Sequence, residues 1–171
     1  ADAADLAGRG CLTPDHVIRT KGPYLYLEEP AYSDLDTLAA QLAVGVEAYR
    51  QAYRAYFERN VEARGIERTM LDPTPRVVVL PGLGLFAAGA TRKEARIAAD
   101  IAEHNIKTKL WASMIGQYAG LPESGIQTTV SPAVCARPRC MISTRRLPRY
   151  TVILSVKVRL GHVSPGIDSA A

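Results

Sequence analysis

Residues 71–94, LDPTPRVVVLPGLGLFAAGATRKE, decide the fold class, because they read as a strand, a glycine-rich turn and the start of a helix. The β-branched run at 76–80 (RVVVL) predicts a short strand buried on both faces. Thr91 then opens a helix, and Glu94, three residues later, completes a capping box. The order of these signals predicts an α/β fold with a strand–glycine loop–helix core.

The glycine loop at 82–89 is a candidate phosphate site, because α/β proteins present backbone N–H groups to anions where a strand leads through glycines into a helix. The candidate residues are Gly82, Gly84 and Thr91. The spacing Gly-x-Gly-x-x-x-x-Gly differs from the dinucleotide fingerprint, and no P-loop lysine follows. The loop also carries leucine and phenylalanine where phosphate loops are small and polar. A purely structural turn packed over the sheet edge is therefore the alternative.

Two long helices complete the predicted core. Ser33 is the expected N-cap of the first helix, with Asp36 as a weaker capping-box partner, and Gly65 is its expected end. The second helix is expected from Thr91 to about residue 118, and a short strand at 24–27. A buried apolar stripe along the first helix is indicated by residues at gaps of three and four: Leu35, Leu38, Leu42, Val46, Tyr49, Tyr53 and Phe57.

Composition indicates one domain in a reducing compartment. The chain has 171 residues, and its 47% apolar content is enough for a sizeable core. Its apolar runs are too short to span a bilayer, and no signal peptide stands at the front, so no membrane partner is expected. The three cysteines form no CxxC pair, which predicts a cytoplasmic location. The absence of an initial Met suggests a fragment or a processed product.

The charge is unevenly distributed. Residues 1–125 carry 14 Lys/Arg against 16 Asp/Glu, whereas residues 126–171 carry 7 Lys/Arg against Asp168 alone. The chain therefore divides into a body, 1–125, and a basic tail, 126–171. A basic tail favours an anionic partner such as nucleic acid. The body gives no such indication. Tyrosines and arginines are interleaved along the first long helix, but core packing explains the tyrosines better and surface ion pairs explain the arginines better.

One dense polar cluster, D15-H16-x-x-R19-x-K21, could carry chemistry. Arg19 and Lys21 could bind a phosphate or carboxylate, with His16 as acid or base. A helix cap with surface ion pairs is the alternative. The three histidines of the chain lie far apart, with neither His-x-His nor HExxH, so no metal site is expected from this chain alone. The motifs of short-chain dehydrogenases and of serine hydrolases are missing as well.

Two segments, GRGCLTPDHVIRTK at 8–21 and LDPTPRVVVLPGLGLFAAGATRKEARIAADIAEHNI at 71–106, resemble the bifunctional class II aldolase/short-chain dehydrogenase family, also called rhamnulose-1-phosphate aldolase/alcohol dehydrogenase. The resemblance covers roughly residues 8–124. It implies a connecting module between a zinc-dependent aldolase domain and an NAD-binding Rossmann domain. The parent enzyme would cleave a ketose 1-phosphate in rhamnose-type catabolism and act on the released aldehyde. Zinc and NAD are expected in the parent, but no cofactor in this chain, which lacks both catalytic sets.

The glycine loop extends this resemblance. The sequence PGLGLF at 81–86 is similar to the metal-binding element of class II aldolases, a His-x-His followed by Gly-Leu-Phe-like residues. Pro81 and Leu83 stand at the histidine positions. The resemblance thus implies a degenerate class II aldolase-like α/β/α unit that has lost its metal and serves as scaffold or phosphate-binding surface.

The resemblance ends after YAGLPES at 118–124. The family continues there into an acidic, aromatic segment, whereas this chain turns to arginine, proline, serine and cysteine. We therefore expect residues 126–171 to be frameshifted or otherwise non-native. Residues 151–160 (TVILSVKVRL) nevertheless alternate as a strand would.

Two functions remain open from the sequence. The first is a fragment of a sugar-phosphate aldolase fused to a dehydrogenase, inactive alone, with the aldolase and Rossmann domains as partners and a sugar phosphate as candidate ligand. The second is a small α/β module that binds phosphate or nucleic acid through the loop at 82–89 or the basic tail. Of these ligands, nucleic acid is the less expected.

Overall fold

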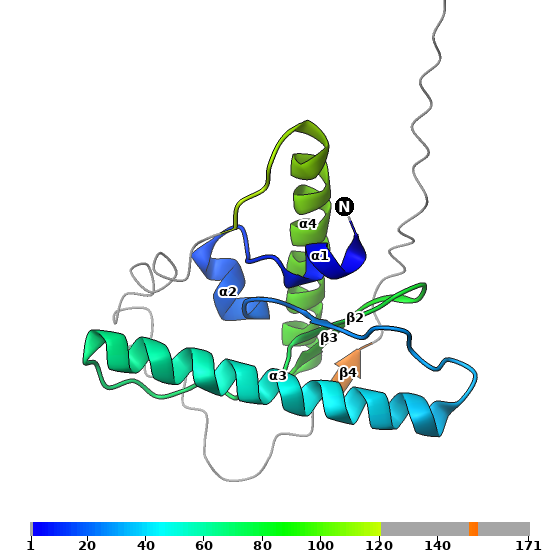
Figure 1. The fold of residues 1–171 in the computed structure, drawn as a ribbon, viewed down its shortest axis with the longest axis horizontal. Coiled ribbons are helices and arrows are strands. Elements are labelled where there is room, and N and C mark those ends of the chain that lie inside the picture. The colour runs from blue at the N-terminus through cyan, green and yellow to red at the C-terminus, as the bar shows by residue number, and fades with distance from the viewer. Residues whose placement is uncertain (1, 121–150, 154–171) are drawn as a thin grey trace, which may run out of the picture.

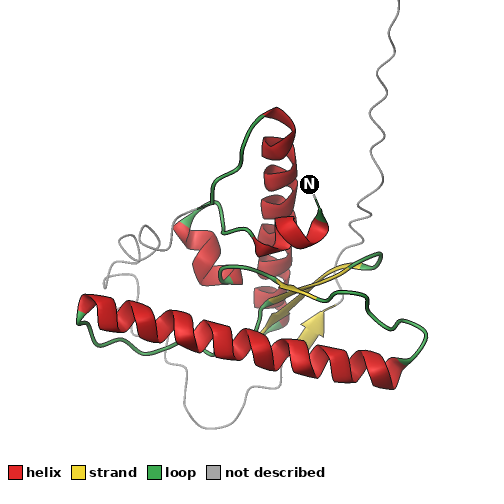
Figure 2. Ribbon diagram, viewed as in Figure 1, coloured by secondary structure: helices red, strands yellow, loops and turns green. Residues whose placement is uncertain are grey.

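The structure is a computed structural model that describes residues 2–120 and 151–153. Its elements are α1 (Ala3–Gly8), α2 (Pro14–Thr20), β1 (Leu25–Tyr26), α3 (Leu35–Arg64), β2 (Val77–Leu80), β3 (Gly84–Gly89), α4 (Arg92–Ile115) and β4 (Thr151–Ile153). The strands form one sheet in the order β1-β2-β3-β4, with β1 parallel to β2 and the other pairs antiparallel (Figures 1 and 2). The predicted α/β class is confirmed.

The glycine-rich segment folds as a β-hairpin, which corrects the expectation of one loop leading from strand to helix. Gly84–Gly89 forms β3, which pairs with β2 from Leu80↔Gly84 to Val77↔Ala87. The turn at 81–83 contains Gly82 with a φ of 78°, a conformation that favours glycine. The physical reason for the difference is that residues 85–88 alternate between buried and half-buried, as a strand between two layers requires.

One face of the sheet packs against α4. Val77 lies opposite Ala87 in the register, Val79 lies opposite Leu85, and all four side chains are buried. α4 presents small side chains to this face, so helix and sheet approach closely. The residues of α4 in the hydrophobic core are Ala98, Ala99, Ala102 and Ile106. Helices α1 and α2 also contact α4 and complete this side of the core (Figure 1).

The opposite face of the sheet meets α3. Leu25 pairs with Val78, which is on the face of β2 turned away from α4, and a Cβ built on Gly45 of α3 would contact the Leu25 side chain at 3.4 Å. The sheet therefore lies between α4 and α3, as an α/β/α unit requires. Figure 1 shows α3 crossing the lower part of the view and extending beyond the strands.

The apolar stripe of α3 is half-buried, which corrects its prediction as core. This helix of 30 residues has no fully buried side chain. Leu35, the first residue of the predicted stripe, is 75% exposed. The periodicity predicted the helix and its inward face, but among the strands α3 contacts chiefly the two-residue β1, which is too short to cover the whole stripe.

The helix caps agree with the sequence in all but one position. Thr91 accepts a hydrogen bond from Glu94 N at 3.2 Å, and the Glu94 carboxylate accepts one from Ala90 N at 3.1 Å. Gly65 ends α3 with a φ of 59°, as predicted. The N-cap of α3, however, is Asp34 and not Ser33, because the Asp34 carboxylate reaches two backbone N–H groups of the first turn.

The described part of the tail forms a strand of the sheet. Thr151–Ile153 forms β4, which pairs antiparallel with β3. The rest of the predicted strand at 151–160 lies outside the described residues, as does 121–150. The hypothesis of a non-native tail stays a prediction. Across the described part of the chain, no helix has both the length and the apolar character needed to cross a membrane.

Candidate functional site

His16 lies at the edge of a hydrogen-bonded network between α2 and α4. Thr13 caps α2 and accepts from His16 N, which fixes the start of the helix. The half-buried His16 ring places Nδ1 3.0 Å from Asn105 Oδ1. An amide oxygen only accepts hydrogen bonds, so the network assigns the proton of the neutral ring to Nδ1. Nε2 is then the basic nitrogen.

Asn105 connects this histidine to the core. It is 0% exposed on α4, and its Nδ2 donates to the hydroxyl oxygen of Tyr24 at 3.0 Å. Burial raises the pKa of Tyr24 above its ordinary value, so the phenol stays protonated. His104 sets its ring edge-on to His16, with 6.3 Å between ring centroids. The contact with Asn105 orients the imidazole, as an acid/base role of His16 would require, and that role stays a prediction.

Arg19 and Lys21 are placed differently, and the structure does not bring their charges together. Arg19 is exposed, whereas Lys21 is 2% exposed. The Lys21 ammonium donates to the carbonyls of Asp72 and Thr74, and it lies 4.5 Å from the centre of the Tyr53 ring. Burial, helped by the positive charge of Arg76, lowers the pKa of Lys21 to about 8. In this structure Lys21 ties the segment before β2 to α3.

The three residues of the predicted phosphate loop are also separated. Gly82 and Gly84 lie at the hairpin turn, while Thr91 lies beyond the other end of β3. The six residues of β3 span about 17 Å, so these backbone N–H groups cannot contact one small anion together. The Thr91 hydroxyl is occupied by the α4 cap. Turn and helix start therefore remain two independent candidate positions.

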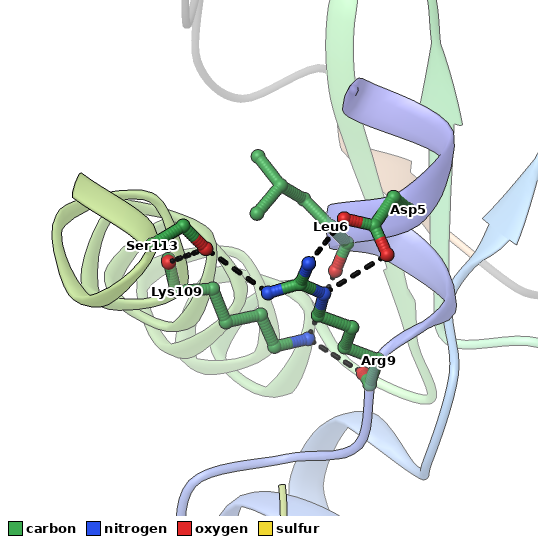
Figure 3. Close-up of polar contacts among 5 residues, drawn as sticks. All are labelled: Asp5, Leu6, Arg9, Lys109 and Ser113. Atoms are coloured by element: carbon green, nitrogen blue, oxygen red, sulfur yellow. Dashed lines mark hydrogen bonds and ion pairs between the residues drawn. The ribbon is translucent and has the colours of Figure 1, made fainter. Parts of the chain in front are cut away.

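Lys109 is a buried residue that sequence reasoning missed. It is 0% exposed, and Nζ donates to Leu6 O at 3.1 Å and to Arg9 O at 2.7 Å (Figure 3). Arg9 in turn forms an ion pair with Asp5 and donates to Ser113 Oγ at 3.0 Å. A cation at the last carbonyls of α1 satisfies groups that the helix leaves without partners. The cluster fixes α1 against α4.

A local signal for Lys109 and Asn105 exists in the sequence. Asn105 follows Ala102 by three residues and Lys109 follows Ile106 by three, so both fall on the buried stripe of α4, where a surface helix should be apolar. A polar residue at such a position requires a buried partner. The partner itself could not be predicted, because Leu6 lies 103 residues away from Lys109.

Cys11 is part of the same buried region. Its thiol is 0% exposed and donates to Lys21 O at 2.9 Å. Burial raises the pKa of Cys11 above its ordinary value, so the thiol stays protonated and is no candidate nucleophile.

Zinc and NAD were expected in the parent enzyme, so the fit of this chain to each can be tested on its residues. Within 2–120 and 151–153, no three His, Cys, Asp or Glu side chains gather as metal ligands. The neighbouring His16 and His104 give two ligands at most, whereas protein zinc sites use three or four. The hairpin at 77–89 also lacks the strand–turn–helix connection of a dinucleotide site. The described residues therefore fit neither group.

The geometry defines an α/β/α domain with an oriented histidine and, in the part described, no complete catalytic set. The chain belongs to the family "Aldolase class II, second domain", which matches residues 1–128. The expected relation to class II aldolases is thereby confirmed.

A longer protein is similar to this chain. The "Uncharacterized oxidoreductase YuxG" of Bacillus subtilis (strain 168) is 29% identical over 123 residues, which cover 71% of this chain and 17% of that protein. The chain thus corresponds to about a sixth of its relative's length. No solved structure matches the chain significantly.

Proposed function

We propose that this chain is a connecting domain of a larger cytoplasmic enzyme in which a sugar-phosphate aldolase is fused to an NAD-dependent short-chain dehydrogenase. One observation supports this most strongly. The chain belongs to a class II aldolase family, and a relative that is much longer is named an oxidoreductase. An aldolase-family domain inside an oxidoreductase is what a fusion of the two activities would contain.

In this proposal the domain is inactive alone and acts on rhamnose-type sugar phosphates only within the parent polypeptide. Zinc belongs to the aldolase domain and NAD to the Rossmann domain, and both domains are partners of this one. The domain contributes a scaffold and a phosphate contact at the 82–84 turn or at Arg19. His16, oriented by Asn105, is a candidate acid or base toward a ligand shared with a neighbouring domain.

The test compares the purified chain with a longer natural polypeptide of the family that contains this domain. The chain alone should neither cleave rhamnulose 1-phosphate nor reduce NAD with lactaldehyde, whereas the longer polypeptide should do both. Turnover by the isolated chain would contradict the inactive role. Failure of the longer polypeptide in either reaction would contradict the fusion.

Within the longer polypeptide, His16→Gln tests the acid/base role. The variant should lower kcat of one reaction by about 100-fold or more, in the range of general acid–base catalysis, and flatten its pH profile. His104→Gln is the matched control, because His104 contacts the same ring without the Asn105 hydrogen bond. Equal effects of both variants would assign the pair to structure.

A further inference from the structure

The last turns of α4 expose apolar side chains and cover polar ones. Trp111, Met114 and Ile115 are 59%, 69% and 91% exposed, and together they are named the apolar end of α4. Lys109, in contrast, is 0% exposed, and Ser113 accepts a hydrogen bond from the α1 side (Figure 3). A helix between a protein core and water shows the reverse arrangement.

We propose that the apolar end of α4 is the surface against which the next domain of the parent polypeptide docks. The partner surface is an uncharged hollow of aliphatic and aromatic side chains that encloses the Trp111 ring. The inference rests on the proposed function, in which the next domain is the dehydrogenase domain.

The distribution of charge along α4 separates this end from the rest of the helix. Eight of the eighteen residues 92–109 are charged, whereas none of residues 110–122 is. A helix that ends in water is stabilised by cations near its C-terminus, but the last turn of α4 has no basic residue. Loss of charge around tryptophan and methionine is typical of the core of a protein interface.

The three side chains form one surface. Their spacing of three and four residues places them on the same side of the helix. Apolar residues exposed singly are common on proteins, but a contiguous group indicates an interaction site. Tryptophan is also among the residues that contribute most to binding energy at interfaces.

The apolar end projects from the domain. Figure 1 shows the last turns of α4 rising beyond α1 and α2. The chain then turns back, because the Tyr118 hydroxyl donates to Gly10 O at 2.9 Å and a Cβ built on Gly120 would lie 2.9 Å from Gly10 Cα. These contacts hold 118–120 against the domain and leave the apolar end open to a partner.

The parent polypeptide supplies a partner at this position. The matched region is 17% of the length of the relative, so most of that protein lies outside this domain. The family match ends at residue 128, and the eight residues after Gly120 span at most about 28 Å. The next part of the parent therefore begins within reach of the apolar end.

The small size of the surface favours a covalently linked partner. Three partly exposed side chains offer less than the ~800 Å² that each partner buries in a stable complex of separate proteins. Domains of one polypeptide meet at a high effective concentration, so a small contact is sufficient. A membrane surface fits less well, because helices that lie on lipid carry Lys and Arg beside their apolar face.

The experiment is hydroxyl-radical footprinting, read by mass spectrometry, of the purified chain and of a longer natural polypeptide that contains this domain. Trp111 and Met114 should be oxidised about fivefold or more slowly in the longer polypeptide, because interface anchors lose contact with water. Tyr32, which is 40% exposed and bonded to Pro81 O, is the internal control and should react equally in both proteins.

Trp111→Gln tests the same surface within the longer polypeptide. The variant should undock the domain, so that Met114 is oxidised at the rate found in the isolated chain. Val44→Gln is the matched control, since Val44 is 72% exposed on α3, and Met114 should stay protected in it. In the isolated chain both variants should shift the melting temperature by less than about 2 °C, which shows that the domain still folds.

Three outcomes would overturn the proposal. Equal oxidation of Trp111 in the two proteins would mean that the apolar end stays in water. A dimer of the isolated chain that Trp111→Gln converts to a monomer would assign the surface to a second copy. Trp111 is the single tryptophan of the chain, so a blue shift of its fluorescence with phosphatidylcholine/phosphatidylglycerol vesicles would assign the surface to a membrane.

Footprinting is independent of the activity assays that test the proposed function. Protection of Trp111 in a longer polypeptide that lacks one of the two activities would contradict the fusion alone. Both activities without protection of Trp111 would contradict the docking surface alone.

Discussion

Helices α3 and α4 are both long and capped, yet they are buried to opposite degrees. The shorter α4, with 24 residues, has seven buried side chains, whereas α3, with 30 residues, has none. The difference follows from what each helix meets. α4 meets the sheet with alanines, so the backbones approach closely, while among the strands α3 contacts chiefly the two-residue β1, where Gly45 lies against the Leu25 side chain. An apolar stripe therefore predicts which face turns inward but not how deeply it packs.

The largest effect is expected at Gly89, where β3 meets α4. A Cβ at Gly89 would lie 2.5 Å from Ala95 N, a backbone atom, so Gly89→Ala must push α4 away. We expect a loss of about 3 kcal/mol in the free energy of unfolding, measured by urea denaturation. At Gly45 of α3 the nearest atom, 3.4 Å away, is the end of the Leu25 side chain.

Gly45→Ala is therefore the matched variant for α3. It should be neutral or stabilising by up to about 1 kcal/mol, because alanine favours the helix. If Gly89→Ala and Gly45→Ala lose equal stability, our account of the different packing of α4 and α3 is wrong.

The next effect concerns the buried cation of α4. Lys109→Met removes the ammonium that donates to Leu6 O and Arg9 O, and leaves these carbonyls without a partner. We expect a loss of about 2 kcal/mol, again from urea denaturation. Lys107→Met on the same helix removes a lysine that is paired with Glu103 on the surface and should cost less than about 0.5 kcal/mol. Comparable losses of unfolding free energy in the two variants would show that Lys109 does not hold α1 against α4.

A smaller effect, on the pH dependence of stability, tests the contact between Lys21 and α3. The pKa of Lys21 falls from 10.5 to about 8 in the folded chain. Between these values the unfolded chain binds the proton and the folded chain releases it, so stability should rise with pH. The window ends near pH 9, because above it the Cys11 thiol, whose pKa burial raises from 9.0, acts in the opposite direction, as does Tyr24 above pH 10. Melting temperatures across pH 8–9 should therefore increase.

Lys21→Met should flatten this rise, whatever its effect on the absolute melting temperature. The remaining slope would come from Lys109, whose pKa burial also lowers. A profile of Lys21→Met that is parallel to that of the original chain would contradict the assignment.

The smallest effect is expected at the most exposed apolar residues of α3. Val44 is 72% exposed and Leu35 is 75% exposed. Val44→Ser and Leu35→Ser should each change the free energy of unfolding by less than about 0.5 kcal/mol, since little apolar area leaves water there. A loss above 1 kcal/mol, by calorimetry on the isolated chain, would show that α3 is covered more than the structure indicates.

The sequence could predict the features that depend on neighbouring residues, but not those that depend on contacts between distant segments. Strand β2, the Thr91 cap and the Gly65 end of α3 were predicted correctly, because each depends on neighbouring residues. Strand β3 was missed since Gly84 and Gly89 resemble loop glycines. The structure shows that Gly89 is required by close packing against α4, a contact that no local pattern encodes.

The candidate site was predictable only in part. His16 was identified from its polar neighbours, but Asn105, which orients its ring, lies 89 residues away. Lys21 was predicted as a ligand-binding cation because the sequence does not reveal that its ammonium is enclosed by two carbonyls and a tyrosine ring. Burial of a charge depends on the tertiary fold and was therefore beyond sequence reasoning.

Amide hydrogen exchange on the whole chain tests most directly the claim that α4, and not the longer α3, organises this domain. Exchange reports the local free energy of opening at each residue. Amides of α4 around Ala102 and Ile106 should exchange slowest, at the rate of global unfolding, while those of α3 around Val44 should open well below that free energy. Equal protection of the two helices, or slower exchange in α3, would contradict the account.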